Sequence, residues 1–321
     1  MSTFPDGLFQ YGGEPVGGAR YSSPWATAYF VDGTNGYDGF DGKGPTTAKK
    51  TIQAAVTAAG YQDVIYVRAK RPQTDASDPG VYTESVNVAY AKDNLSIIGV
   101  TPHVLDPYYG PKLLVPDVVS EWGFHVISPG FHLENFTVQM WDITTTPAGA
   151  VFLESESGFA AKAGSVGASI VNCMLWSGQL RIDGGYDCTT YGVTFNNMVK
   201  DNTLGYNFSC PSTGGINPQW GMKVQNCAFL GKHAAAPTNT YMYIQGSAWG
   251  WQIRDCYFDI VPASGQFIYI NGDVDGFLAN CYFNSANATY AAGAGSEIQL
   301  GAGVMKVVGC HDVTGEIGSG T

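Results

Sequence analysis

Charged side chains are scarce in this sequence, at 13% of its 321 residues, and only 16 residues are Lys or Arg. A surface that binds nucleic acid needs clustered basic residues, whereas the formal net charge here is −11, which argues against nucleic acid as the main partner. The sequence lacks an apolar run long enough to cross a bilayer. Its first residues also lack the basic and apolar parts of a secretory signal. We therefore expect no nucleic-acid partner, no membrane partner and no signal peptide.

Recognisable metal and catalytic motifs are missing as well. The seven Cys are not spaced as CxxC pairs, and the five His show no ligand spacing. No His pairs with a Ser or a Cys as a recognisable triad. His311 follows Cys310 and leaves a Cys–His nucleophile open, but a buried structural thiol is favoured there. We expect no cofactor apart from a calcium alternative discussed below.

Glycine is abundant, at 42 residues, and 45% of the chain is hydrophobic, which favours a β-rich body with many turns. Two kinds of short segment alternate along it. One is exemplified by IVNCMLWS from Ile170 and VQNCAFLG from Val224, the other by FIYINGD from Phe267. From Cys227, the Cys residues of the first kind recur after 29, 25 and 29 residues. Such a period is typical of one coil of a β-solenoid.

A bend interrupts the first kind of segment, because apolar residues on its two sides cannot all face inward if alternation is strict. One residue in the left-handed conformation would restore the pattern, and Asn, Asp and Gly tolerate that conformation. The predicted bend column is Asn94, Asn135, Asn172, Gly192, Asn226, Asp255, Asn280 and Gly309. The sequence therefore predicts an all-β fold, a single-stranded right-handed parallel β-helix.

Two inward stacks are expected beside this column. The first consists of Leu95, Phe136, Cys173, Val193, Cys227, Cys256, Cys281 and Cys310, and the second of Ile97, Val138, Leu175, Phe195, Phe229, Phe258 and Phe283. Cys256 and Cys281 would lie close enough for a disulfide, but parallel Cβ directions favour reduced thiols. Cys188 and Cys210 lie off the column and are the better candidates for a bridge.

Three segments are expected along the chain. Residues 1–25 are an extended arm, residues 26–110 an N-terminal cap region and residues 111–321 the β-helix body. In the cap region a helix is expected from Thr46 or Thr47, as N-cap, to Gly60. Ile52, Ala55, Val56 and Ala59 share one of its faces. This helix would cover the open apolar end of the solenoid.

The cap region also carries a family resemblance. The runs FVDGTNGYDGFDG, AKKTIQAAV, DVIYVRA, VNV and NLSIIG follow one another between residues 26 and 100. In this order they resemble the N-terminal end of pectin-lyase-like right-handed β-helix proteins. That family includes polysaccharide lyases, hydrolases, and virion spikes and decoration proteins, so the resemblance implies the fold rather than one activity. The opening MSTFPDGLFQYGGEPVGG resembles the starts of tailed-bacteriophage structural proteins.

Stacking of the second kind of segment suggests one catalytic arrangement. Glu154 and Asp183 would face outward on neighbouring coils, about 5 Å apart, which suits the two carboxyl groups of a retaining glycosidase. Arg181 lies beside Asp183, and family members that cleave pectate use a basic residue and calcium. The alternative, which we favour, is an ordinary polar outer face.

A calcium site is the other candidate. Asp32, Asn35, Asp38 and Asp41 form an oxygen-rich loop, but their spacing does not match an EF-hand, and Gly-Asp loops are common turns. We favour the turn.

Aromatic residues on the outer face point to an assembly. Tyr243, Tyr269, Tyr257 and Tyr282 are expected to face outward, and aromatic residues are enriched at interfaces. We expect a homotrimer. The favoured function is a non-enzymatic phage virion protein, a capsid decoration or a head or tail spike, docked on other virion proteins through residues 1–25. The alternatives are a polysaccharide lyase or glycoside hydrolase of the tailspike depolymerase type, and an adhesin that binds host surface glycans.

Overall fold

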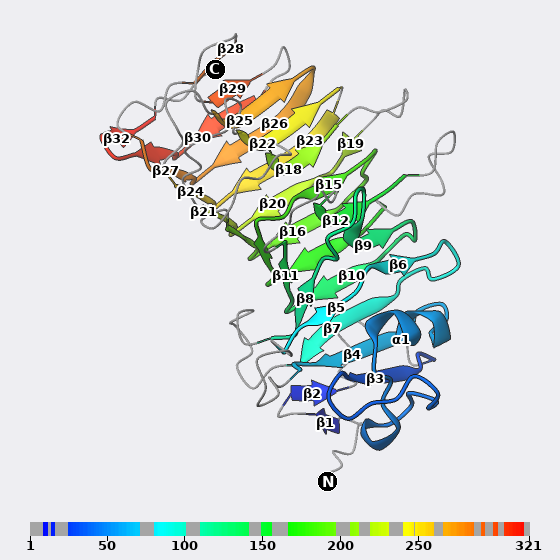
Figure 1. Ribbon diagram of the computed structural model, residues 1–321. Helices are drawn as coiled ribbons and strands as arrows, with labels where there is room; N and C mark the ends of the chain where they lie inside the picture. The colour runs from blue at the N-terminus through cyan, green and yellow to red at the C-terminus, as the bar shows by residue number, and fades with distance from the viewer. Residues whose placement is uncertain are drawn as a thin grey trace.

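The computed structural model describes residues 25–70, 80–100, 110–140, 149–155, 166–196, 206–211, 219–230, 240–246, 248–259, 266–285, 290–292, 298–300 and 305–317, and the backbone of residues 9–11 and 14–16. In these residues the chain is a right-handed parallel β-helix with one 3-10 turn, η1 (Pro45–Thr47), and one helix, α1 (Ile52–Ala58). Strands of successive coils stack into three sheets along an elongated body (Figure 1). The predicted fold class is confirmed.

Each coil contributes a strand to each sheet in turn. Sheet 1 contains β3 (Ala28–Asp32), β4 (Val64–Arg68), β7 (Ser96–Val100), β10 (His132–Glu134), β13 (Ser169–Val171), β16 (Thr189–Tyr191), β20 (Lys223–Gln225), β23 (Ala248–Arg254), β26 (Val274–Ala279) and β30 (Met305–Val308), with β19 (Gln219–Trp220) beside β23. Sheet 2 contains β5 (Tyr82–Thr83), β8 (Lys112–Leu114), β11 (Thr137–Gln139), β14 (Met174–Trp176), β17 (Thr194–Asn196), β21 (Ala228–Leu230), β24 (Tyr257–Phe258), β27 (Tyr282–Phe283), β31 (His311–Asp312) and β32 (Gly315–Glu316). Sheet 3 contains β6 (Val86–Val88), β9 (Trp122–Val126), β12 (Gly149–Leu153), β15 (Leu180–Ile182), β18 (Tyr206–Cys210), β22 (Thr240–Gln245), β25 (Gln266–Asn271), β29 (Ile298–Leu300) and β28 (Tyr290–Ala292).

The central inward row of sheet 1 shows how the core forms. Its members are in register from coil to coil and are buried: Tyr29, Ile65, Ile97, Leu133, Ile170, Thr190, Val224, Ile253, Leu278 and Val307. Because each strand pairs in parallel with the strands before and after it, one inward position stays inward along the whole sheet. Ile97 therefore belongs to this row and not to the sheet 2 stack where the sequence placed it.

Bend 2, the turn from sheet 1 to sheet 2, carries seven of the eight predicted bend residues. Asn135, Asn172, Gly192, Asn226, Asp255, Asn280 and Gly309 have φ between 48° and 64°. The backbone N–H of each residue from Asn135 to Asn280 donates to a carbonyl of the next coil, as from Asn226 to Arg254. The left-handed conformation turns the chain and keeps the apolar residues on both sides inward.

Asn94 also has a left-handed φ, 58°, but it lies at the opposite end of sheet 1. Ser96 is in register with His132, which places Gly99 at the level of Asn135 and Gly130 at the level of Asn94. This second turn, bend 1, has its own left-handed column: Gln62, Asn94, Gly130, Gly167, Asp187, Gly221 and Gly250. Leu95 therefore stacks with Phe131, which follows Gly130. The predicted alignment was wrong at Asn94. A bend rich in Asn and Gly lies at each end of the short strands of sheet 1, and only the strand pairing distinguishes the two bends.

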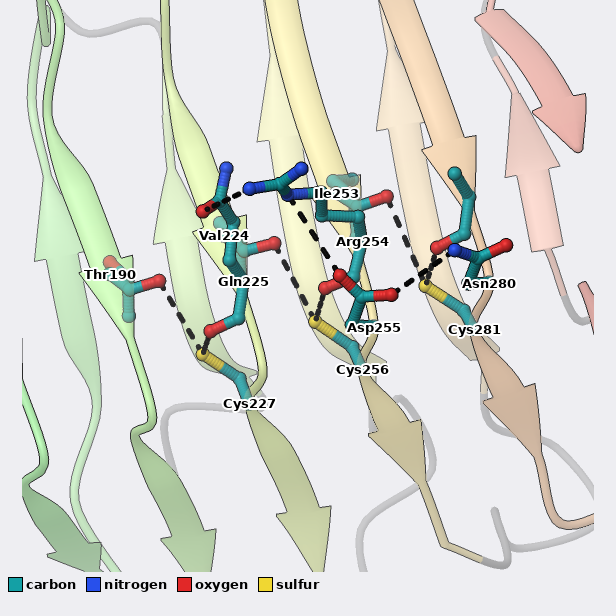
Figure 2. A network of polar contacts seen from close by, with 11 residues as sticks. Thr190, Val224, Gln225, Cys227, Ile253, Arg254, Asp255, Cys256, Asn280 and Cys281 are labelled. Carbon is teal, nitrogen blue, oxygen red and sulfur yellow. Dashed lines mark hydrogen bonds and ion pairs between the residues drawn. The ribbon is translucent and has the colours of Figure 1, made fainter.

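Inside bend 2 the Cys residues form a stack of thiols, shown in Figure 2. The Cys256 thiol donates to the carbonyl of Arg254 at 3.2 Å and lies 3.6 Å from the Val224 carbonyl of the preceding coil. Cys227 and Cys281 repeat the pattern. All seven cysteines are buried and none forms a disulfide, so the candidate bridge between Cys188 and Cys210 is absent. Cys188 lies in the stack inside bend 1, and Cys210 in the inward row of sheet 3.

Two residues farther along, the phenyl rings of sheet 2 lie face to face. Phe195 and Phe229 are 4.6 Å apart, Phe229 and Phe258 4.7 Å, and Phe258 and Phe283 4.8 Å, with interplanar angles of 9° or less. All four rings are fully buried. This stack matches the predicted one, and it fixes the register of sheet 2 through ring contacts as well as hydrogen bonds.

The N-terminal helix is shorter than the sequence predicts. Thr51 is its N-cap and accepts a hydrogen bond from the Ala54 N–H, and the C-cap is Ala59. Lys49 is extended and pairs with Val31, which prevents the helix from starting at Thr46 or Thr47. The carboxylate of Glu84, on the next coil, accepts the N–H groups of Ile52 and Gln53 at 2.9 Å each. Burial raises the pKa of Glu84.

Helix α1 covers the first coil, as expected. Ile52, Ala55, Val56 and Ala59 are buried in the main core. The helix contacts β3, β4 and β6, the first strands of sheets 1 and 3, at the N-terminal end of the body (Figure 1). Of the predicted arm, the structure describes the antiparallel pairing of β1 (Phe9–Tyr11) with β2 (Glu14–Val16). All three sheets continue across residue 110, the expected boundary of the cap region, because β7 pairs with β10, β5 with β8 and β6 with β9.

Candidate functional site

The outward face of sheet 3 holds the predicted carboxylates. Glu154 and Asp183 follow β12 and β15, and the Asp183 N–H donates to the Leu153 carbonyl at 3.0 Å, so the two residues lie on neighbouring coils. Each already has a basic partner. The Glu154 carboxylate is 2.5 Å from His125 Nε2, and Asp183 accepts both Nε and Nη2 of Arg181 at 2.9 and 3.0 Å.

An aromatic ring lies between these two pairs. Phe152 is in register with His125 on one side and with Arg181 on the other. The His125 ring is parallel to it at 5.2 Å, the Arg181 guanidinium is 5.1 Å from its centroid, and Trp122 stacks on it at 4.9 Å. A stacked cation and a bidentate ion pair hold Arg181 in one position. The sequence indicated Arg181 and both carboxylates but missed His125 and Phe152, which precede Glu154 by 29 and 2 residues.

This arrangement does not provide a free proton donor. In a retaining glycosidase one carboxyl group attacks the sugar and the other presents its proton to the leaving group. Both oxygens of Asp183 accept hydrogen bonds from Arg181, and the side chain is only 9% exposed. The Glu154 carboxylate is hydrogen-bonded to His125. The geometry therefore resembles a histidine–carboxylate hydrogen bond and an arginine–aspartate ion pair on a polar face more than a pair of catalytic carboxyls.

The predicted interface tyrosines form two outward rows. On sheet 3, Tyr243 stacks between Tyr206, at 4.6 Å, and Tyr269, at 5.5 Å. Burial raises the pKa of Tyr206 and of Tyr243. On sheet 2, Tyr257 and Tyr282 are parallel at 5.7 Å and more than a third exposed. Tyr206 was not identified from the sequence, because it pairs with Thr240, three residues before Tyr243, and only the side-chain positions bring the two rings together.

The three carboxylates of the predicted calcium loop each accept hydrogen bonds from the chain, and Asn35 is one of the donors to Asp32. Asp32 accepts hydrogen bonds from Thr34 and Asn35 and a 2.8 Å ion pair from Arg68. Burial of the carboxylate raises its pKa, but these hydrogen bonds outweigh burial, so the pKa of Asp32 is lowered.

The other two loop carboxylates are engaged in the same way. Asp38 accepts from Lys50 and Thr51, and Asp41 from Lys43 and Thr47. Across the described part of the chain, no group of three or more His, Cys, Asp and Glu could hold a metal ion. Calcium binding in this loop stays a prediction that the structure does not test.

A polar group on sheet 1 was not foreseen. His132, on β10, contacts Ser169 of β13 through Nδ1 at 2.7 Å and Glu134 through Nε2 at 3.1 Å. From the sequence no His was recognised as the partner of a Ser in a triad, whereas the structure brings His132 and Ser169 into contact. The signal was available: His132 and Ser169 each precede a bend asparagine, Asn135 or Asn172, by three residues, so they lie side by side on consecutive coils.

Comparisons with known proteins concern the fold. No family model matches the chain, and no curated protein sequence matches it. Among solved structures it is similar to ORF18 of Geobacillus virus E2, with 10% identity, a TM-score of 0.45 and 92% of this chain covered. The chain spans 63% of the length of that viral protein.

It is also similar to the pectin methylesterase from Aspergillus niger, with 14% identity, a TM-score of 0.40, and 92% of this chain and 88% of that chain covered. A rhamnogalacturonan lyase matches with 13% identity, a TM-score of 0.40, and coverage of 91% and 75%. Among the described residues no helix is long and apolar enough to span a membrane. The strand pairing itself makes the chain a right-handed parallel β-helix.

Proposed function

We propose that this protein is a structural component of the surface of a phage particle, a capsid decoration or a spike, attached through residues 1–25. The proposal rests on the observation that the strands of the arm are not part of the three sheets. In the described residues β1 pairs only with β2, and neither strand joins sheets 1 to 3. A strand pair that is not part of the three sheets is suited to docking on another virion protein, and the sequence of this segment resembles the starts of phage structural proteins.

The outer faces support assembly rather than glycoside cleavage. The tyrosine rows on sheets 2 and 3 offer stacked aromatic surface of the kind enriched at interfaces, and we propose that they pack in a homotrimer. The Glu154 and Asp183 carboxylates are bound by His125 and Arg181, so sheet 3 presents a stacked, charge-paired surface that suits contacts with host surface glycans.

Deletion of residues 1–25 tests the attachment. The full chain and the truncated chain are mixed with phage particles that lack this protein, and bound protein is measured after sedimentation. The truncated chain should stay folded and trimeric, by melting temperature and light scattering, but should lose particle binding at least tenfold. Equal binding of the two chains would show that the arm does not dock.

A second function is favoured by one observation, the placement of Glu154 and Asp183 on neighbouring coils. It is a polysaccharide-cleaving enzyme of the tailspike type. Release of reducing ends or unsaturated sugars from acidic and neutral polysaccharides is the test. Turnover that is lost in Asp183→Asn and kept in Asp187→Asn, at a bend 1 position away from Glu154, would establish the enzyme and displace the structural proposal.

A further inference from the structure

Ser169, His132 and Glu134 form a continuous hydrogen-bonded line on the outward face of sheet 1. The Ser169 Oγ is 2.7 Å from His132 Nδ1, and the Glu134 Oε2 is 3.1 Å from His132 Nε2. The imidazole thus lies between a hydroxyl and a carboxylate, one on each ring nitrogen. This is the arrangement by which a histidine activates a serine nucleophile, recognised by roles and distances whatever the fold.

The two hydrogen bonds are consistent with a neutral His132 that is protonated on Nε2. A carboxylate only accepts hydrogen bonds, so Nε2 carries the proton that is donated to Glu134. In neutral imidazole the other nitrogen, Nδ1, carries a lone pair that can accept the Ser169 hydroxyl. Glu134 therefore holds His132 in the form that can take a proton from Ser169.

The β-helix holds these groups in place. His132 is in register with Ser169, and the inward neighbours Leu133 and Ile170 are in register and almost fully buried. His132 and Glu134 are two residues apart on one strand, so both face outward. Side chains on paired strands with a packed inner face are positioned more rigidly than side chains on loops.

Burial and access differ across the line. His132 is 4% exposed and the Glu134 side chain 16%, which limits competition by water for their hydrogen bonds. Ser169 is partly exposed. Its neighbours on the next coil are Thr189, in register with it, and Tyr191, which is 43% exposed. A substrate would reach the Ser169 hydroxyl from the side of the solenoid that these two residues border.

We propose that Ser169 is the nucleophile of an acyl-transfer centre that hydrolyses carboxylic esters, with His132 as general base and Glu134 as its positioning residue. Ser169 Oγ forms a bond to the ester carbonyl carbon while its proton passes to His132 Nδ1. The C–O bond of the ester then breaks, and the leaving alkoxide takes that proton. Water attacks the acyl-serine with His132 again as base, which releases the carboxylic acid and restores Ser169. This activity goes beyond the proposed structural role.

Covalent labelling of the full chain by an alkyl fluorophosphonate tests the proposal. This probe phosphonylates activated serine hydroxyls and releases fluoride. We expect one adduct by intact mass, located on Ser169 by peptide mapping, and none in Ser169→Ala. His132→Ala should slow labelling about a hundredfold or more, the usual contribution of a general base. Glu134→Gln should slow labelling less than His132→Ala does. In each variant the rate of p-nitrophenyl acetate hydrolysis should fall in parallel with the rate of labelling.

A matched control places a serine in the same outward row without the imidazole. Ser169 is in register with Thr189, and Thr189 with Lys223 on the coil after that. A serine introduced by Lys223→Ser therefore lies in the same row but far from His132. In the Ser169→Ala background this variant should stay unlabelled. Unchanged melting temperatures show that each variant is folded. No adduct on Ser169 in the folded wild-type chain, or equal labelling rates in wild type and His132→Ala, would overturn the proposal and leave a structural hydrogen-bond line.

Discussion

Gly99 lies against the backbone of Asn135 so closely that a Cβ atom on Gly99 would be 2.1 Å from the Asn135 carbonyl oxygen. The two residues are at the same level of consecutive coils, where bend 2 begins. Gly99 has no left-handed φ, so its lack of a side chain is required by the close approach of the two coils.

Gly99→Ala should therefore destabilise the protein by about 2–3 kcal/mol, because the contact is with backbone and the coils must separate. Gly44→Ala is the control, since its Cβ would meet only Thr47 Oγ1 at 3.6 Å and its φ is −153°; it should change stability by less than about 0.5 kcal/mol. Urea unfolding of the two variants measures the difference. Equal stabilities would contradict the tight coil contact at Gly99.

Substitutions at Asn226, which has a φ of 53°, test whether bend 2 requires a residue that tolerates the left-handed conformation. Asn226→Ala and Asn226→Gly both remove the exposed carboxamide, but only alanine adds the cost of a left-handed backbone, about 1–2 kcal/mol. We expect the Gly variant to unfold at a higher urea concentration than the Ala variant. If the two variants unfold together, the residue does not need the left-handed conformation.

The buried thiols predict a loss of stability in alkali. Burial raises the pKa of Cys173 and of Cys188 to about 12. Between about pH 9 and 12 the unfolded chain releases these protons while the folded chain keeps them, so the free energy of unfolding falls as pH rises, by about 1.4 kcal/mol per pH unit for each thiol.

Cys173→Val removes one such thiol, and Val193 occupies the same inward position on the next coil. Unfolding under reducing conditions at pH 8, 9 and 10 should show the variant losing less stability than the wild type between pH 9 and 10. A constant difference between the two proteins at all three pH values would mean that the Cys173 thiol does not titrate differently on unfolding.

Glu84 should control the first turn of α1. Glu84→Ala leaves the Ile52 and Gln53 N–H groups without their acceptor and should cost about 1–2 kcal/mol, as loss of a helix cap does. Hydrogen exchange at these two amides should accelerate in Glu84→Ala, and less in Glu84→Gln, which keeps one acceptor oxygen. Exchange at the Ala59 amide, which donates to Ala55, is the internal control. Unchanged exchange at Ile52 and Gln53 would show that water replaces Glu84.

Local patterns in the sequence were sufficient for the fold class and for most of bend 2. The left-handed preference of Asn, Asp and Gly, and the inward residues on either side of them, are properties of single segments. For that reason Asn135, Asn172 and Asn226 could be recognised one by one. Repetition then required a solenoid, since each coil buries its apolar face only against its neighbours.

Register between coils was decided by tertiary structure. Asn94 and Leu95 have the local pattern of bend 2 but belong to bend 1, because the pairing of β7 with β10 shifts them by one bend. The same pairing rule brought Ser169 to His132 from a distance of 37 residues. Composition and spacing thus determined that this chain is a β-helix with structural thiols inside. Which polar side chains meet on its outer face was decided only when the coils stacked, because contacts across coils depend on register and not on neighbours in the chain.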